Sequence, residues 1–113
     1  MKLSGFTIFV AHIDNAITFY EKLFGRAPDH KEENSCTFMF SKTKYFIHKN
    51  MAREEGMPPN EDHVEFEVEN IDEAVNRLKQ EGFSLEIEAR QYYWGTSAYL
   101  RDLEGRLIEL VQK

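Results

Sequence analysis

The hydrophobic and polar positions of the chain alternate in short runs that predict strands, while two longer runs have helical spacing. Residues 4–11 place side chains on two faces in turn, as a β-strand does. A helix then follows, with apolar residues at helical spacing as far as Gly25, which can adopt the left-handed conformation that ends a helix. We expect the Asp14 side chain to cap the start of this helix.

The second half of the chain repeats this plan. A strand at 62–69 leads into a helix at 72–81, and Gly82 ends it. The segment Ile71-Asp72-Glu73-Ala74-Val75 matches Ile13-Asp14-Asn15-Ala16-Ile17 at an offset of 58 positions (71 − 13), about half of the 113 residues. A repeat of this kind predicts a domain built from two similar modules.

Shorter strands complete each half and give the order βαβββ twice. The remaining expected segments are an extended piece from Pro28, a hairpin of 36–41 and 44–49 around Lys42-Thr43, a strand at 84–89, and a hairpin of 95–101 and 106–112 that turns at Leu103-Glu104-Gly105. We therefore predict an α+β fold in which two βαβββ modules form a curved mixed sheet cup with the helices outside.

The length of the chain allows one domain with a genuine core. We expect residues 1–113 to form this single domain, with module one at about 1–50 and module two at about 61–113. The connection at 51–60 holds a Pro-Pro pair and almost no periodic apolar pattern.

Charge and cysteine content narrow the classes of partner. The formal net charge of −6 argues against nucleic acid or an anionic membrane, since both need a basic face. The charge suits a cationic small molecule, or it simply keeps a cytosolic protein soluble. Cys36 is the only cysteine, alternates with Phe38 and Phe40, and is expected in the core. A reducing, cytoplasmic location fits this cysteine usage, and the N-terminal segment predicts neither a signal peptide nor a membrane span.

The alternation of each strand assigns its two faces. We expect the purely apolar face to pack on the helices, with Phe6, Ile8, Val10, Val64, Phe66, Val68, Ile108 and Leu110. The opposite face would line the concavity of the sheet, with Gly5, Thr7, Phe9, His63, Glu65, Glu67, Leu107, Glu109 and Val111. Glu109 stands out in this set because burial of an unpaired carboxylate is costly. It must meet a metal, a cation, a hydrogen-bond donor or water.

Several motifs resemble those of the vicinal oxygen chelate superfamily, which includes glyoxalase I, bleomycin-resistance proteins and extradiol dioxygenases. The segment 101–110 resembles the closing signature DPDGNxIEL, and 13–25 resembles the family's first helix. His63 falls where the motif GHIAL begins the second module, and Tyr93-Trp94-Gly95 resembles a WG pair before the penultimate strand. The resemblance spans essentially the whole chain.

In metal-using members of this family, ligands come from matching strands of the two modules. The resemblance implies His63 on the fifth strand and Glu109 on the eighth, whereas the first-strand position is Gly5, which has no ligating side chain. The fourth-strand position lies near Ile47 or His48. His63, Glu109 and His48 would suit zinc, nickel, manganese or iron. Alternatively, His63 and Glu109 hydrogen-bond each other or a water.

The resemblance implies two main functions, and a degenerate domain that serves as an interaction module is a third alternative. In the first, a homodimer without a bound metal sequesters a planar or cationic small molecule, and the expected ligand-binding residues are Phe9, Glu65, Glu67, Tyr93, Trp94 and Arg101. Arg101 could receive an anionic group of the ligand or form an exposed salt bridge, and the glutamates could equally lie on a solvated face. In the second, a metal-dependent lyase, isomerase or dioxygenase acts on a substrate with vicinal oxygens.

Overall fold

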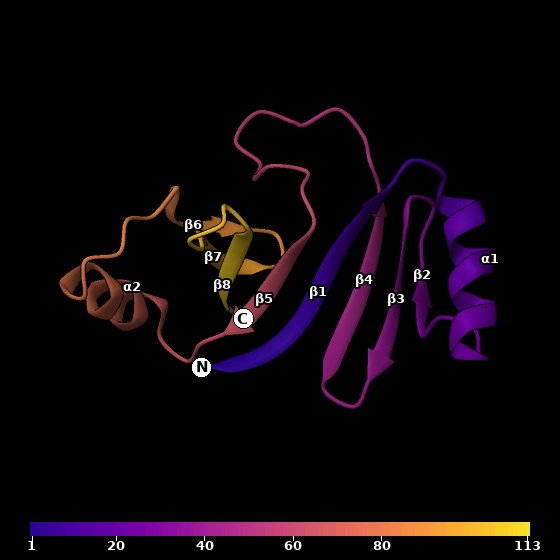
Figure 1. Ribbon diagram of the computed structural model, residues 1–113, viewed down its shortest axis with the longest axis horizontal. Coiled ribbons are helices and arrows are strands. Elements are labelled where there is room, and N and C mark those ends of the chain that lie inside the picture. The colour runs from indigo at the N-terminus through magenta and orange to yellow at the C-terminus, as the bar shows by residue number, and fades with distance from the viewer. The chain divides into compact units, whose positions relative to one another are not determined.

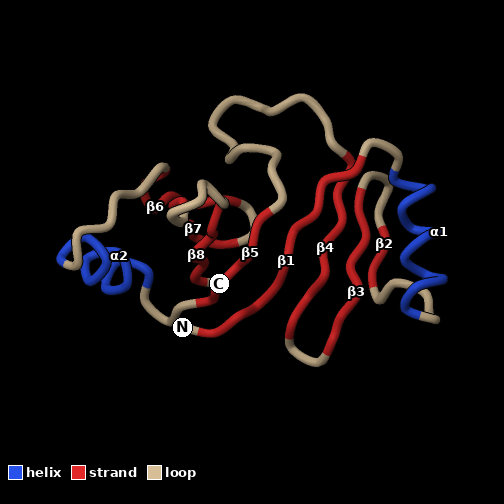
Figure 2. Tube along the Cα trace, in the orientation of Figure 1, coloured by secondary structure: helices blue, strands red, loops and turns tan.

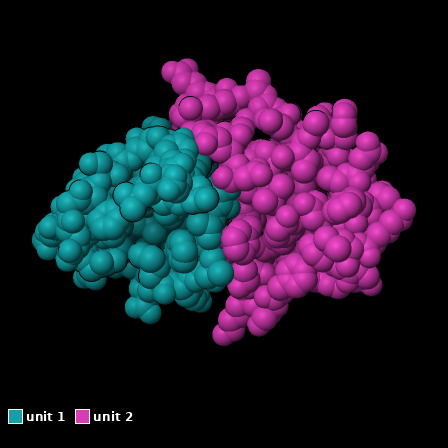
Figure 3. Space-filling view, viewed as in Figure 1, with its two compact units in different colours: residues 1–4, 63–113 teal, residues 5–62 magenta.

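The computed structural model describes all 113 residues and divides them into two compact units, which Figure 3 distinguishes by colour. The N-unit is Gly5–Asp62, and the C-unit is His63–Lys113 together with Met1–Ser4. Strand β1 (Lys2–Val10) contributes residues to both units. Each unit is described separately below.

The N-unit holds one helix and a four-stranded mixed sheet (Figures 1 and 2). After β1 come α1 (Ile13–Phe24), β2 (His30–Lys31), β3 (Ser35–Phe40) and β4 (Thr43–Lys49). The spatial order is β2-β3-β4-β1, in which β2, β3 and β4 pair antiparallel and β4 pairs parallel with β1.

The C-unit repeats this topology. Its elements are β5 (His63–Glu67), α2 (Ile71–Gln80), β6 (Ile87–Tyr92), β7 (Gly95–Arg101) and β8 (Leu107–Gln112). The order β5-β8-β7-β6 places β8 parallel to β5 and antiparallel to β7, and β7 antiparallel to β6. The predicted α+β class and the repeated βαβββ order are therefore confirmed.

Two strands lie in slightly different places from those expected. The first hairpin turns at Ser41 and Lys42, one residue earlier than predicted. The strand expected at 84–89 begins only at Ile87, because the chain leaving α2 is still held to the helix by the Phe83 N–H, which donates to the Leu78 carbonyl (3.0 Å).

The two helices start differently. Asn70 caps α2, and its side chain accepts a hydrogen bond from the Glu73 N–H (3.0 Å). The prediction that Asp14 caps α1 is wrong. The cap residue is His12, which makes no side-chain capping bond, and Asp14 lies inside the first turn, where its charge still favours the helix dipole. Gly25 ends α1 with φ 71°, as expected.

The core of the N-unit joins α1 to β3 and β4. Ile13 and Ile17 of the helix pack on Cys36, Phe38 and Ile47. Cys36 is fully buried, as predicted, and burial raises the pKa of its thiol, which makes the thiolate scarce. Phe6, expected in this core, is instead 38% exposed, because the cluster consists of residues of α1, β3 and β4, and of β1 only Val10 packs against it.

The core of the C-unit lies between α2 and one face of its sheet. Val75 packs with Val68 and Ala98, and Leu78 packs with Leu100 and Leu110. The predicted apolar face of β5 and β8 is thus the face that α2 covers. The polar side chains of these two strands lie on the opposite face. Neither α1 nor α2 has the length and apolar character that a membrane-crossing helix needs.

The contrast between the two helix starts predicts a difference in stability. Asn70→Ala removes the capping acceptor of α2 and should lower the free energy of unfolding by about 1 kcal/mol. His12→Ala is the matched control, because no capping bond is lost, and should change it by less than about 0.5 kcal/mol. Urea denaturation measures both, and equal effects would contradict the assigned role of Asn70.

Candidate functional site

Three strands of the C-unit bring a row of side chains together on the face away from α2. Glu65 of β5 is the register partner of Glu109 of β8, which is in turn opposite Tyr99 of β7. Because every second residue shares a face, His63 and Ser97 join this row. The strand alternation thus gathers five side chains capable of hydrogen bonding on one face.

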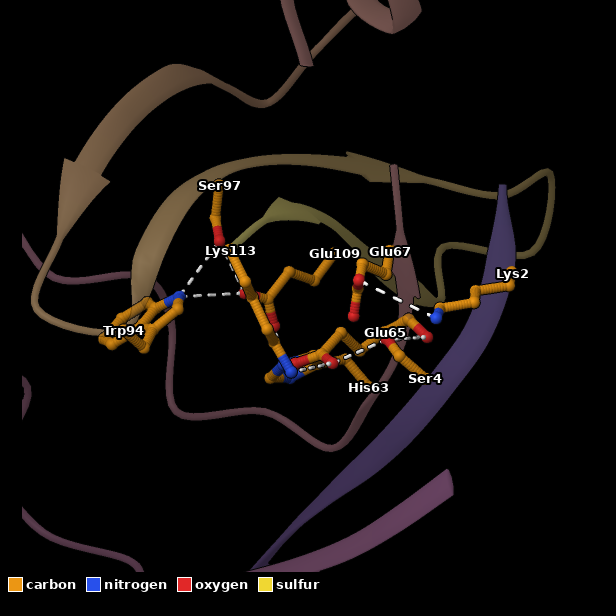
Figure 4. Close-up of polar contacts among 9 residues, drawn as sticks. All are labelled: Lys2, Ser4, His63, Glu65, Glu67, Trp94, Ser97, Glu109 and Lys113. Atoms are coloured by element: carbon orange, nitrogen blue, oxygen red, sulfur yellow. Dashed lines mark hydrogen bonds and ion pairs between the residues drawn. The ribbon is translucent and has the colours of Figure 1, made fainter. Parts of the chain in front are cut away.

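Glu109 is the centre of this group, and three donors surround its carboxylate (Figure 4). His63 Nε2 lies 3.1 Å from Oε1. The Ser97 hydroxyl donates to Oε2 (2.7 Å), and the Trp94 indole N–H donates to the same oxygen (3.1 Å) and to Ser97 Oγ (2.9 Å). Glu109 is only 4% exposed, so these contacts replace the water that a buried carboxylate loses.

Tyr99 closes the row from the side of β7. Its ring lies edge-on to the imidazole of His63, with 6.0 Å between ring centres. Burial, with the nearby charge of Glu109 as a second cause, raises the pKa of the Tyr99 phenol far above its usual range. The phenol therefore stays protonated and can act only as a neutral group at physiological pH.

The turn between β6 and β7 positions Trp94. Its ring stacks on Tyr92, with 4.5 Å between centres and 3° between planes, while Tyr93 points outward and is 88% exposed. Gly95 follows with φ 140°, and a Cβ there would lie 2.6 Å from the Gln112 carbonyl oxygen. The glycine of the predicted WG pair therefore allows β7 to approach the end of β8 closely.

Two further glutamates of β5 are held by residues near the chain ends. The Ser4 hydroxyl donates to Glu65 Oε2 (2.6 Å), and Lys113 Nζ lies 3.4 Å from the same oxygen. Glu65 is 2% exposed. Glu67 lies 3.9 Å from Lys2 Nζ. The expected acidic series is thus divided between a buried carboxylate in the row and a partly exposed one beside it.

Arg101 and Phe9, predicted to bind ligand, and His48, predicted to bind metal, have other partners in the structure. Arg101 forms an ion pair with Glu86 (2.7 Å from Nε to Oε1) and donates to the Gly105 carbonyl, which secures the β7–β8 turn. Phe9 and His48 belong to the N-unit, where their rings are 6.0 Å apart. Arg101 therefore stabilises the β7–β8 turn, whereas Phe9 and His48 contact each other in the N-unit.

The register of the N-unit identifies the counterparts of His63 and Glu109. Gly5 is 58 positions before His63 (63 − 5), matching the offset of the sequence repeat. Within each parallel pair, Glu109 is opposite Glu65, and Phe46 is opposite Thr7, which is 58 positions before Glu65. Glu109 therefore corresponds to Phe46, not to Ile47 or His48 as expected from the sequence.

His48 nevertheless lies on the relevant face of its sheet. Ile47 is fully buried against α1, so its neighbour His48 points to the opposite face, where it contacts Phe9 and Phe46. Its Nδ1 is 2.7 Å from the carbonyl of Lys49. The sequence left the direction of the His48 side chain open, and the structure places it on the face opposite α1.

The donor set of the C-unit is incomplete for a divalent metal. His63 and Glu109 are suitable types of ligand, but a protein site normally supplies three. No group of three His, Cys, Asp or Glu side chains is arranged to hold an ion. At Gly5, even a Cβ would lie 2.9 Å from the Lys44 carbonyl oxygen. The residues that the structure brings together do not fit a metal by themselves.

The cavity found in the C-unit is separate from the Glu109 network. Its volume is about 500 Å³, and it opens beside the start of α2, with Lys2, Glu67, Asn70, Glu73 and Arg77 among its lining residues. Positive and negative side chains share this lining. We place the candidate site at Glu109 because its buried carboxylate and convergent donors are there.

Sequence reasoning missed Ser4, Ser97, Tyr99 and Lys113. Ser97 and Tyr99 could have been found, because the predicted turn at 103–105 fixes the pairing of 95–101 with 106–112 and sets Tyr99 opposite Glu109. Ser4 and Lys113 carry no comparable signal, since their contacts with Glu65 depend on how the chain ends fold.

Comparisons with known proteins agree with this architecture. The family model described as Glyoxalase/Bleomycin resistance protein/Dioxygenase superfamily matches residues 2–110. No curated protein matches the sequence.

Solved structures share the fold at low sequence identity. A methylmalonyl-CoA epimerase from Mycobacterium tuberculosis is 23% identical, with a TM-score of 0.75 over 98% of this chain and 87% of that one. A protein described as NAD-dependent benzaldehyde dehydrogenase from Legionella pneumophila is 13% identical, with a TM-score of 0.77 over 96% of both chains. A superfamily member from Vibrio splendidus 12B01 is 12% identical, with a TM-score of 0.67 over 96% of both chains.

The contacts around Glu109 predict the effect of removing one donor. Ser97→Ala takes a hydroxyl from a buried carboxylate and should lower the free energy of unfolding by about 1–3 kcal/mol. The emission of Trp94, the only tryptophan, should shift as well, because its indole N–H loses a partner. Ser84→Ala, at an exposed position, is the control and should leave both readings unchanged. An equally small effect of both variants would contradict the network.

Proposed function

Because the chain belongs to the Glyoxalase/Bleomycin resistance protein/Dioxygenase superfamily, we propose that it binds a planar or cationic small molecule in the cleft of a homodimer, without an intact metal site. The single observation that carries this proposal is the asymmetry of the repeat. One module has His63 and Glu109 at the matching positions, and the other has Gly5 and Phe46. A glycine and a phenylalanine offer no ligand to a metal.

The contacts of Glu109 support the same proposal. Both oxygens of Glu109 already interact with protein groups. His63, Ser97 and Trp94 compensate for its burial. The carboxylate can therefore remain buried in the folded protein without a metal ion.

Charge and aromatic character favour a planar or cationic ligand. Glu65 and Glu109 are adjacent in the register, and the net charge of the chain is −6. The stacked rings of Tyr92 and Trp94 add flat, electron-rich surfaces beside Glu109. Carboxylates and aromatic faces both attract organic cations. A cytoplasmic location remains part of the proposal and is consistent with a single buried cysteine.

A metal-dependent lyase, isomerase or dioxygenase is the second candidate. The close approach of His63 Nε2 to Glu109 Oε1 (3.1 Å) favours it, because an imidazole and a carboxylate are brought together. It requires at least one further ligand, for which the sequence offers His48. A bound ion would polarise a carbonyl or enolate oxygen of the substrate.

Ligand binding can be measured with Trp94 as an internal reporter. In the presence of EDTA, planar organic ammonium compounds should quench Trp94 emission to saturation, and neutral compounds of the same shape should bind at least about tenfold more weakly, since one charge–carboxylate contact is worth about 1.4 kcal/mol or more. Failure of all planar cations to bind would contradict the proposal.

Metal titration separates the two candidates. The binding proposal predicts that zinc, nickel, manganese and iron neither bind stoichiometrically nor raise the melting temperature. Stoichiometric binding that is lost in both His63→Ala and Glu109→Gln would contradict the metal-free site and favour the enzyme candidate instead. Lys79→Met, in an exposed ion pair with Glu88, is a suitable control variant.

The assembly state is a separate expectation of the family resemblance. A homodimer with a two-fold axis should give a mass of twice 13.3 kDa by light scattering at micromolar concentration. A monomer under these conditions would contradict the dimer and leave the metal-free ligand site to be judged by the binding data.

A further inference from the structure

Two buried carboxylates lie side by side in the C-unit, and different groups compensate for each. Glu65 and Glu109 are register partners on neighbouring parallel strands, and they are 2% and 4% exposed. Like charges in such positions repel each other, so each needs favourable contacts of its own. Glu109 has His63, Ser97 and Trp94, while Glu65 interacts with Ser4 and with the ammonium group of Lys113.

The contacts that Ser4 and Lys113 make with the Glu65 carboxylate differ in strength. The Ser4 hydroxyl is 2.6 Å from Glu65 Oε2, a short charge-assisted hydrogen bond. Ser4 Oγ also lies 3.2 Å from the backbone carbonyl oxygen of Glu65. Lys113 Nζ is 3.4 Å from Oε2, beyond the 2.7–2.9 Å usual for an ammonium–carboxylate bond. Ser4 therefore fixes the carboxylate, and Lys113 adds a looser contact.

Lys113 reaches this position from outside the sheet. It follows the last residue of β8, and in Figure 4 its side chain runs back towards Glu65 and His63. The Lys113 side chain is 42% exposed, whereas that of Glu65 is 3% exposed. A lysine has a long flexible stem, so its ammonium can leave the carboxylate and enter water without any change in the strands.

We propose that the Lys113 ammonium is a displaceable internal cation, which occupies Glu65 in the free protein and gives way to the ammonium group of a bound ligand. This inference rests on the proposed binding of planar cations and specifies where their charge is held. Exchange of one ammonium for another leaves the charge balance of the buried carboxylate pair unchanged. A neutral ligand gives no such exchange and leaves Lys113 in place.

The first test compares the affinity of wild type and Lys113→Met for one probe, (2-naphthylmethyl)trimethylammonium, by isothermal titration calorimetry. Removal of the competing ammonium should tighten binding about fivefold, the scale of a partly exposed ion pair. The neutral probe 2-naphthalenemethanol should show no change. Lys79→Met is the matched control, because it removes the same charge from an exposed ion pair of the same unit, and should leave both affinities unchanged.

The possible results distinguish the two proposals. If the cation binds wild type and Lys113→Met equally, the displacement is wrong and the proposed function stands. If the cation binds neither protein, the proposed function fails for this ligand class and the displacement fails with it. Tighter binding of the cation to Lys113→Met, with no change in Lys79→Met, supports both proposals.

A second measurement follows Lys113 directly in the wild-type protein. The quaternary probe has no reactive amine, so acetic anhydride labelling with mass spectrometry can report the reactivity of each lysine while the probe is bound. The cation should raise the acetylation rate of Lys113 at least threefold and leave that of Lys42, in the first hairpin turn, unchanged. An unchanged rate at Lys113 with the probe bound would overturn the proposal.

Discussion

The buried carboxylate of Glu109 is the constraint on which the C-unit depends. It lies in the middle of β8, and its burial would be strongly unfavourable without donors. Those donors come from three places: His63 on β5, Ser97 on β7 and Trp94 in the turn before β7. Each contact therefore links β8 to another part of the unit. The same contacts make Glu109 a rigid, preorganised acceptor in the candidate site.

The two modules place different side chains on the same topology. In the N-unit, the position equivalent to Glu109 is Phe46, and the position equivalent to His63 is Gly5, whose backbone lies against Lys44. The corresponding face is aromatic, with Phe9 and His48 nearby. The two modules therefore share the order and pairing of their strands and helices, while the matching positions carry side chains of different chemistry. This asymmetry in side chains is the observation on which the proposed binding function rests.

Much of the fold could be predicted because its signals are local. Strand alternation, helical spacing and the glycines at positions 25 and 105 gave the element order, and the lone carboxylate among apolar residues correctly marked Glu109 as a group needing partners. The Asp14 cap was wrong because a capping bond depends on where the helix begins within one residue. The fourth-strand ligand position was expected near Ile47 or His48 and is Phe46 in the structure. The expectation was displaced because the register of β4 is set by its pairing with β1, which lies far away in sequence. Lys113 was unpredictable because its contact with Glu65 depends on the path of the chain after β8.

The hydrogen bond from the Trp94 indole to Glu109 offers the most direct measurement of the central claim, because the protein has a single tryptophan. In a ¹H–¹⁵N spectrum of metal-free protein, we expect one downfield-shifted indole N–H resonance that exchanges slowly with solvent and does not move when zinc or nickel is added. A fast-exchanging resonance in the metal-free protein, which becomes protected only when metal is added, would contradict the account.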